Sequence, residues 1–296
     1  MDWETRLITL YDFICKQYTQ GLWVYCQRFS AYTDLSFSDE EVMCIYLFGV
    51  MEKRREIKQI YEHTRNHLSE WFPQLPSYTG FVQRLNQIAD VFAPLSTALQ
   101  ESCSQNGVIP DVWLGDSFPI KMAHAKRSGQ AKVARTLASK GYCSSKDEYY
   151  YGVKVHVFGK KRAKTLPLPE LIGLSGAHEA DLNAFRQISE HFQNGEIYLD
   201  KAYADALLKQ LSEEKQQLKI LTPIKKKKGQ AFLDSADQLF STAVSRVRQP
   251  IESLFNWLEE KTGIQRASKV RSYNGLMVHV FGRIAAAMWM LSERAI

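Results

Sequence analysis

The sequence predicts an α/β protein in which a mixed sheet is flanked by helices and preceded by a helical N-terminal module. Apolar residues recur at helical spacing through the first hundred residues, and after Asn106 and Gly107 they change to short strand-like runs that alternate with helical segments. Of the 296 residues, 45% are hydrophobic and 24% charged, which is typical of a soluble globular chain and excludes a largely disordered one. We therefore expect a helical module over residues 1–108 and an α/β domain over residues 109–296.

Four segments of the N-terminal module have helical periodicity. They are residues 3–18, 42–50, 57–71 and 78–95. Ser38 and Glu41 form the pattern of a capping box, so the second helix is expected to begin there. Pro73 and Pro76 end the third.

Five short segments of the second domain are predicted strands, and they alternate with helical segments. The strands are residues 112–116, 149–158, 168–174, 196–200 and 218–223, and the helices are residues 181–192, 204–215 and 235–261. Pro250 is expected to break the last of these helices and to occupy the first position of a new one. An apolar helix over residues 275–293 closes the chain.

Positive charge is concentrated in three blocks. Residues 121–164 contain twelve Lys or Arg against two acids, whereas the net charge of the whole chain is only +6. A run of four lysines follows at residues 225–228, and Lys261, Arg266, Lys269 and Arg271 form the third block. A solvated surface explains any one block, but three together favour a polyanionic partner, above all nucleic acid.

Cysteine usage and hydropathy indicate the compartment. The five cysteines include no CxxC pair, which argues against a disulfide framework and a structural zinc site. No uninterrupted apolar run has the length of a membrane span, and the first residues include Asp2 and Glu4, unlike a secretory signal. We expect a cytoplasmic protein without a membrane partner.

Three acids are candidates for catalysis. Asp116 and Asp200 each follow the apolar residues of a predicted strand, and active sites gather beyond the carboxyl ends of strands in such sheets. Glu252 is the third, in the first helical turn after Pro250. Taken singly, each Asp is equally explained as the start of a turn, and Glu252 is better explained as a capping carboxylate.

A series of short motifs resembles one protein family. The motifs are Asp116-Ser117-Phe118-Pro119, Tyr142-Cys143-Ser144-Ser145, Tyr149-Tyr150-Tyr151-Gly152-Val153-Lys154, Leu199-Asp200-Lys201-Ala202-Tyr203 and Arg248-Gln249-Pro250-Ile251-Glu252. In this order and spacing they resemble a bacterial insertion-sequence transposase of the DDE class, of the group conventionally numbered nine-eighty-two. The resemblance implies a ribonuclease-H-like fold with the first strand at the centre and the fourth beside it.

The resemblance also implies the catalytic residues. Asp116, Asp200 and Glu252 match the three acids of the family, and Arg248 precedes Glu252 by four residues, as in related transposases. Those relatives carry a Tyr and a Lys where this sequence has Ser245 and Glu259, so the two accessory roles are not carried over.

The chemistry implied by the family is metal-dependent phosphodiester transfer. Two Mg²⁺ ions, for which Mn²⁺ can substitute, would be held by the three acids while the ends of the element are cut and their 3′-hydroxyls joined to target DNA. A hydrolytic nuclease on the same fold and a non-catalytic, domesticated DNA-binding protein are the alternatives. The partners are double-stranded DNA, both terminal inverted repeats and target, and a second copy of the chain in a homodimer assembled on DNA.

Basic residues near these acids are candidates for contacts with the DNA backbone. They are Lys121, Lys126, Arg127, Lys201, Lys225, Lys226, Lys227, Lys228, Arg248 and Lys261. Reading of the terminal repeats is expected of the helical module, where Arg54, Arg55, Lys58 and Arg65 are candidates that a solvated helix face explains equally well. His156 is expected to pack inside a strand, and Asp181 to cap a helix rather than bind metal.

Overall fold

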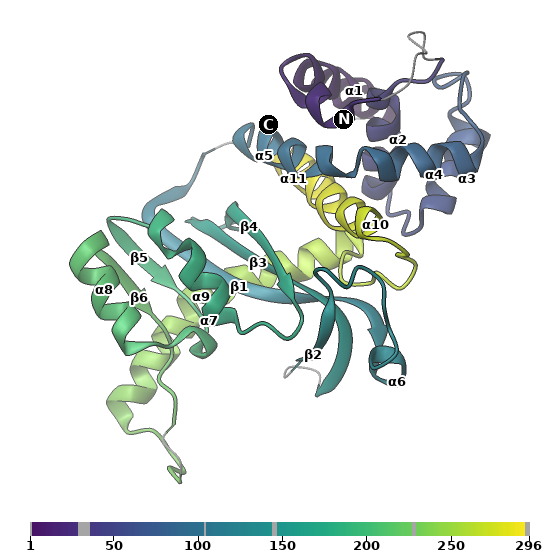
Figure 1. Ribbon diagram of the computed structural model, residues 1–296. Coiled ribbons are helices and arrows are strands. Elements are labelled where there is room, and N and C mark those ends of the chain that lie inside the picture. The colour runs from purple at the N-terminus through teal and green to yellow at the C-terminus, as the bar shows by residue number, and fades with distance from the viewer. Residues whose placement is uncertain (1, 29–35, 104, 144–146, 227–228, 294–296) are drawn as a thin grey trace. The chain divides into compact units, whose positions relative to one another are not determined.

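The computed structural model describes residues 2–28, 36–103, 105–143, 147–226 and 229–293 (Figure 1). The chain forms two compact units: Met1–Ser104 together with Leu258–Ile296, and Gln105–Trp257. The first boundary lies within a few residues of the predicted one at residue 108. Residues 258–296, expected in the second domain, instead group with the helical unit, because the C-terminal helix packs against helices of the N-terminal module.

The helical unit is built from α-helices and short 3₁₀ turns. These are α1 (Trp3–Thr19), η1 (Leu22–Cys26), α2 (Asp39–Met51), α3 (Ile57–His67), α4 (Tyr78–Gln87), η2 (Ala89–Val91), α5 (Phe92–Glu101), α10 (Tyr273–Met277), the π-helical turn η5 (Val278–Gly282) and α11 (Arg283–Glu293). Helix α2 is the centre of the unit, with every side chain from Val42 to Met51 buried. Its predicted capping box is present: Ser38 Oγ accepts from Glu41 N at 3.2 Å, and Ser38 N donates to the Glu41 carboxylate at 2.7 Å.

Two helical predictions need correction. The helix predicted over residues 78–95 is divided into α4 and α5, which places Pro94 in the first turn of α5, where its missing N–H has no intrahelical partner to lose.

The segment Tyr273–Glu293 is long and apolar enough to cross a membrane, which was not expected. However, 78% of its most apolar window is buried inside the protein, as in a core helix.

The described residues of the α/β unit form six strands and six helical segments. They are β1 (Val108–His124), α6 (Ala125–Ser128), β2 (Ser139–Cys143), β3 (Glu148–Arg162), β4 (Leu168–Gly176), α7 (Asp181–Ile188) with η3 (Ser189–His191), β5 (Gly195–Tyr198), η4 (Lys201–Tyr203), α8 (Ala206–Gln216), β6 (Leu218–Leu221) and α9 (Ser235–Thr262), whose last residues belong to the helical unit. The predicted α/β class and all five predicted strands are confirmed.

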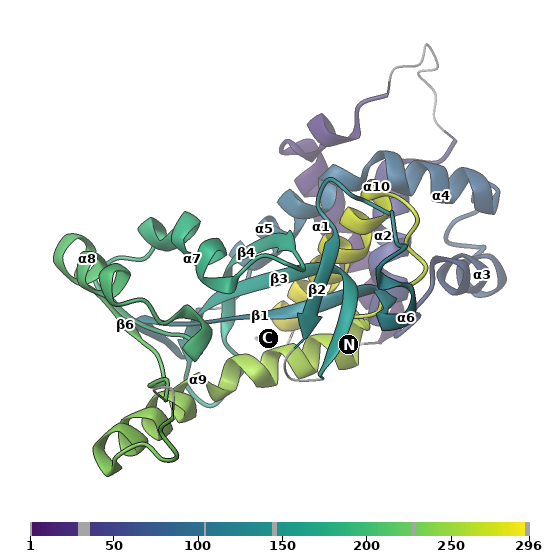
Figure 2. The ribbon, with the colours of Figure 1, turned by 60° about the horizontal axis from the view of Figure 1, so that its bottom comes forward.

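The sheet is mixed, and β1 lies at its centre. β3 pairs with β1 antiparallel, β2 and β4 pair with successive parts of β3, and β5 and β6 continue the sheet parallel to β1 on its other side (Figure 2). The first strand is therefore central and β5 lies beside it, as expected for a ribonuclease-H-like sheet.

Strand β1 is longer than predicted because Phe118, Ile120 and Met122 continue its alternation of buried side chains. Pro119 is tolerated because β5 pairs with β1 only as far as Leu114, and beyond this point no described strand needs an N–H from that edge.

Strand β2 was not predicted. Its Gly141 lies so close to Ala177 that a Cβ there would be 2.1 Å from the Ala177 carbonyl oxygen.

Helices cover both faces of the sheet. Trp113, on one face, belongs to an apolar cluster with Phe185 of α7. Phe118 is on the opposite face of β1 because side chains alternate, and its ring packs against Phe255 of α9 at 4.8 Å between centroids. In Figure 2, α7 and α9 accordingly lie on opposite sides of the strands.

The predicted break at Pro250 is wrong. Helix α9 runs through it from Ser235 to Thr262. Val244 before the proline and Ile251 and Leu254 after it are all buried, so apolar packing on both sides offsets the missing backbone hydrogen bond. Glu252 therefore lies in the interior of a long helix. It is not in a first helical turn, so the capping role that the sequence allowed for it is wrong.

Candidate active site

Asp116 lies at the centre of the sheet, on the face of β1 that α9 covers. Its neighbour Gly115 allows this part of β1 to pack closely, because a Cβ there would be 2.4 Å from Phe158 and 2.6 Å from Leu199. The Asp116 side chain is 21% exposed, and its Oδ1 accepts a hydrogen bond from the Ser117 N–H at 2.8 Å. The carboxylate is thus held in place but still reaches solvent.

Asp200 follows β5 and is the in-register neighbour of Asp116. Strands β1 and β5 are parallel, with Trp113 opposite Ile197 and Leu114 opposite Tyr198. Two residues further along, the same register sets Asp116 beside Asp200, and in-register residues of parallel strands lie on the same face. The sheet topology therefore explains why two acids that are distant in sequence follow adjacent strand positions.

Glu252 is linked to Asp116 through Arg248. The Arg248 guanidinium donates to Asp116 Oδ2 and to Glu252 Oε1, each at 2.5 Å. Arg248 and Glu252 are four residues apart on α9, so both lie on one face of the helix. The Arg248 side chain is 11% exposed, and its Nε is buried without a hydrogen-bond partner.

The electrostatics of Asp116 are unfavourable to its charged form. Its pKa is raised to about 6, chiefly by burial and to a lesser extent by the carboxylates of Asp200 and Asp181, against the lowering effects of Arg248 and of the Ser117 N–H. A carboxyl group whose pKa is raised by burial and by like charges is typical of a functional site. Positive charge brought to this position would stabilise the ionised form.

Asp181 is a further acid that is close enough to raise the pKa of Asp116, although its partners lie on the opposite face of β1, and the sequence interpretation gave it no such role. Ala180 caps α7, so the predicted capping role of Asp181 is wrong. The Asp181 carboxylate instead accepts from Ser117 Oγ at 2.9 Å and from Lys154 Nζ at 3.1 Å. Ser117 and Lys154 both belong to motifs that carry the family resemblance. Their place in those motifs was the one indication in the sequence that a partner of theirs could matter.

The histidines are outside this arrangement. His156 is buried in β3, as predicted, and its Nε2 lies 2.7 Å from Ser175 Oγ. Burial lowers its pKa to about 4, so the ring is neutral at pH 7.

The predicted DNA-contacting residues are found in different environments. Lys121 is buried and paired with Glu148, which removes it from any DNA surface, whereas Lys126 and Arg127 on α6 and Lys201 in η4 are exposed. Lys225 and Lys226 are also exposed, but Lys227 and Lys228 lie outside the described residues. Lys261 belongs to the helical unit and pairs with Glu260 at 2.9 Å.

The acids suit a hard metal ion in chemistry but are not arranged around one. Carboxylate oxygens are the donors that Mg²⁺ prefers. Within residues 2–28, 36–103, 105–143, 147–226 and 229–293, no group of three or more His, Cys, Asp or Glu is positioned to hold a metal ion. Arg248 is the cation between Asp116 and Glu252 in this structure, and it would have to be displaced before both could bind a metal.

Comparison with known proteins identifies the family. The family model described as "Transposase DDE domain" matches residues 106–272, which is more than half of the chain and includes the three acids and Arg248. Comparisons with curated proteins and with solved structures find no significant similarity. The family match and the mixed sheet agree on a ribonuclease-H-like fold, and the chain belongs to the family of transposases with a DDE domain.

Proposed function

We propose that this transposase cuts the ends of an insertion sequence and joins the freed 3′-hydroxyls to target DNA, with Asp116, Asp200 and Glu252 as its catalytic carboxylates. The observation that carries the proposal is the pair of hydrogen bonds from Arg248. Its guanidinium contacts both Glu252 of α9 and Asp116 at the centre of the sheet. The parallel register that aligns Asp200 with Asp116 supports the same set.

Two Mg²⁺ ions, or Mn²⁺ in their place, are the proposed cofactors. When bound, they would stabilise the charge on the attacking and leaving oxygens of the phosphodiester. Asp116 would contribute to both ions because it is the central acid, and Asp200 and Glu252 would each contribute to one. The raised pKa of Asp116 supports this role, because its charged form is disfavoured by burial and by the neighbouring carboxylates, and a bound cation would stabilise that form.

Arg248 has a different role in each state. In this structure it pairs with Asp116 and Glu252. Once released from them, its planar guanidinium suits a bidentate contact with a phosphate of the DNA strand. Lys201 directly follows Asp200 and is exposed, so it is a second candidate for the same phosphate.

Double-stranded DNA is the proposed substrate, as both terminal inverted repeat and target. Lys126, Arg127, Lys225 and Lys226 would hold its backbone without reading sequence. Because two ends must be cut and joined in concert, the active form proposed is a homodimer assembled on DNA.

The test is incubation of the protein with a labelled element end, Mg²⁺ and a target plasmid. Label covalently joined to the plasmid is the expected product. Nicked ends without joining would identify a hydrolytic nuclease, and a mobility shift without cleavage would identify a non-catalytic DNA-binding protein. Either of these results would overturn the proposal.

A further inference from the structure

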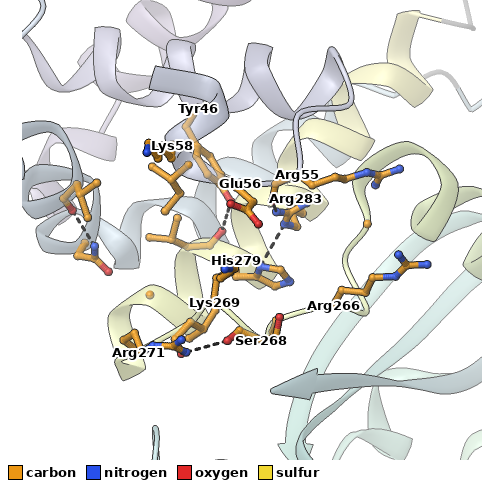
Figure 3. Close-up of a pocket in the computed structure, with 18 of the residues that line it drawn as sticks. Tyr46, Arg55, Glu56, Lys58, Arg266, Ser268, Lys269, Arg271, His279 and Arg283 are labelled. Atoms are coloured by element: carbon orange, nitrogen blue, oxygen red, sulfur yellow. Dashed lines mark hydrogen bonds between the residues drawn. The ribbon is translucent and has the colours of Figure 1, made fainter. Parts of the chain in front are cut away.

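A basic pocket lies wholly within the helical unit, and the catalytic proposal does not use it. It has a volume of about 770 Å³ and is formed by the start of α3, by α4 and by the segment from Glu259 to Arg283 (Figure 3). Its lining includes six Lys or Arg and only three Glu. The positive residues are Arg55, Lys58, Arg266, Lys269, Arg271 and Arg283.

Two of these arginines hold the pocket together. Arg55 donates to the carbonyls of Glu259 and Glu260 at 3.3 and 2.8 Å, which satisfies the exposed C-terminal end of α9. Arg283 is buried and donates to the carbonyls of Thr262 and, at 2.6 Å, Arg55. These two are structural and are poor candidates for contact with a ligand.

A buried histidine extends this framework. His279 lies in the π-helical turn, and burial, with a further effect from Arg283, lowers its pKa to about 3. The neutral ring donates from Nε2 to the Ile264 carbonyl at 2.8 Å and accepts from Arg283 Nε at 3.2 Å. The loop after α9 is thereby fixed to the C-terminal helical segment.

Four other cations are exposed around this framework, and three of them are considered first: Lys58 on α3, and Arg266 and Lys269 on the loop. Across the described part of the chain, no carboxylate lies within 4 Å of the Lys269 ammonium, and Lys58 has only a 3.7 Å pair with Glu62 on its own helix. Arg266 is 3.2 Å from Glu259, but its side chain is 86% exposed. These side chains surround a concave surface and are exposed, so they can exchange water for an anion at little cost.

The three acids of the lining, Glu56, Glu259 and Glu260, leave three of its six positive charges unbalanced. Glu259 accepts from the Gln265 backbone N–H at 2.9 Å, and Glu260 pairs with Lys261 at 2.9 Å. Arg271 adds a further exposed cation, whose guanidinium is anchored to the carbonyls of Ser268 and Val270 at 2.7 and 2.9 Å. The pocket rim is therefore positive across two segments that are about two hundred residues apart in sequence.

We infer that this pocket, through Lys58, Arg266 and Lys269, binds the phosphate backbone of duplex DNA and makes the helical unit a DNA-docking module. The inference rests on the proposed function, which requires a DNA substrate. Exposed cations spread along a rim suit a row of phosphates, whereas a single small anion is usually bound by donors that converge on one buried point.

The experiment measures duplex binding by fluorescence anisotropy, with the full chain in EDTA over a range of salt concentrations. Lys269→Gln is expected to weaken binding about eightfold near 0.1 M salt and to reduce the salt slope by about 0.9, the values for one lost phosphate contact. The triple variant Lys58→Gln/Arg266→Gln/Lys269→Gln should reduce the slope by about 2.7. Lys269→Arg should bind as the wild type does.

Lys16→Gln is the matched control, because Lys16 is an exposed lysine of the same unit outside the pocket, paired with Asp12. Circular dichroism and thermal melting establish that each variant is folded. Among the described residues, the chosen side chains make no hydrogen bond to the backbone, so their replacement is not expected to disturb the fold. A salt slope that is unchanged in the triple variant, or reduced equally by Lys16→Gln, would overturn the inference. So would displacement of the duplex by millimolar inorganic phosphate or a mononucleotide, which would indicate a small-anion site.

The outcome is separable from that of the proposed function. If the pocket variants bind normally while the wild type still joins ends to a plasmid, the pocket assignment fails and the transposase remains. If the variants lose binding but the wild type never cleaves, the DNA-docking pocket stands and the catalytic proposal fails.

Discussion

Arg248 and Asp116 are separated by 132 residues in sequence, yet the guanidinium lies 2.5 Å from the carboxylate. This ion pair joins α9 to the central strand of the sheet, and the second half of the guanidinium holds Glu252. Arg248 is thus an internal cation between two of the three acids proposed to bind metal.

Arg248→Gln is expected to make the protein more dependent on divalent metal. Without the guanidinium, Asp116 and Glu252 lose their positive partner, so the metal-free variant should melt at a lower temperature than the wild type. Mg²⁺ should then raise its melting temperature by more than it raises that of the wild type, because binding no longer has to displace an arginine. Arg246→Gln, an exposed arginine on the same helix, is the control. Equal Mg²⁺-induced shifts in all three proteins would contradict the proposed exchange.

Asp116→Asn, Asp200→Asn and Glu252→Gln are each expected to abolish cleavage of a labelled element end and to leave DNA binding largely intact. Each substitution removes a charged oxygen ligand with little change in shape. Cleavage and binding are measured on the same preparations, by denaturing gel and by anisotropy. Retained cleavage by any one variant would remove that residue from the catalytic set.

Gly115→Ala is expected to destabilise the protein by about 1–3 kcal/mol, because the new methyl group would overlap Phe158 and Leu199. Urea unfolding measures the effect. Gly173→Ala on β4 is the matched control, since a Cβ there meets no atom within 4 Å. Similar losses in the two variants would mean that close packing beside Asp116 is not the reason for the glycine.

His156 is expected to make the protein less stable in acid. Its pKa in the folded state, about 4, lies below its ordinary value of 6.5, so the unfolded state binds the proton more tightly. This contribution to stability is complete above pH 6.5 and is lost as the pH falls towards 4, with a slope of at most about 1.4 kcal/mol per pH unit.

The check is urea unfolding between pH 7 and pH 4 of the wild type and of His156→Gln. The slope of stability against pH should be smaller in the variant, by an amount equivalent to at most one proton. A parallel dependence in the wild type and His156→Gln would contradict burial of a neutral ring.

Much of the fold follows from local sequence signals. The capping box at Ser38 and the five predicted strands are found where the pattern places them. Local rules fail where tertiary packing outweighs them. Pro250 alone predicts a helix break, but the buried residues on both sides of it belong to one apolar face that the continuous helix preserves.

The candidate site was predictable only in part. The motifs indicate Asp116, Asp200 and Glu252, but the role of Asp181 depends on the register that sets Ser117 and Lys154 beside it, and no local pattern encodes that register. Lys121 looks available in the sequence, yet in β1 it is buried between two buried apolar neighbours and is paired with Glu148. The basic pocket combines α3 with a loop near the C-terminus, so its cations appear in the sequence only as separate charges.

The most direct test of the central claim is the uptake of Mn²⁺ by the protein bound to an element end, counted from the electron paramagnetic resonance signal of the free ion. We expect the wild-type complex to take up two more ions per active site than the free DNA does. The Asp116→Asn complex should lose this uptake while still binding the DNA. Equal uptake by the wild-type complex, the Asp116→Asn complex and the free DNA would contradict the account, because the three acids would then hold no metal.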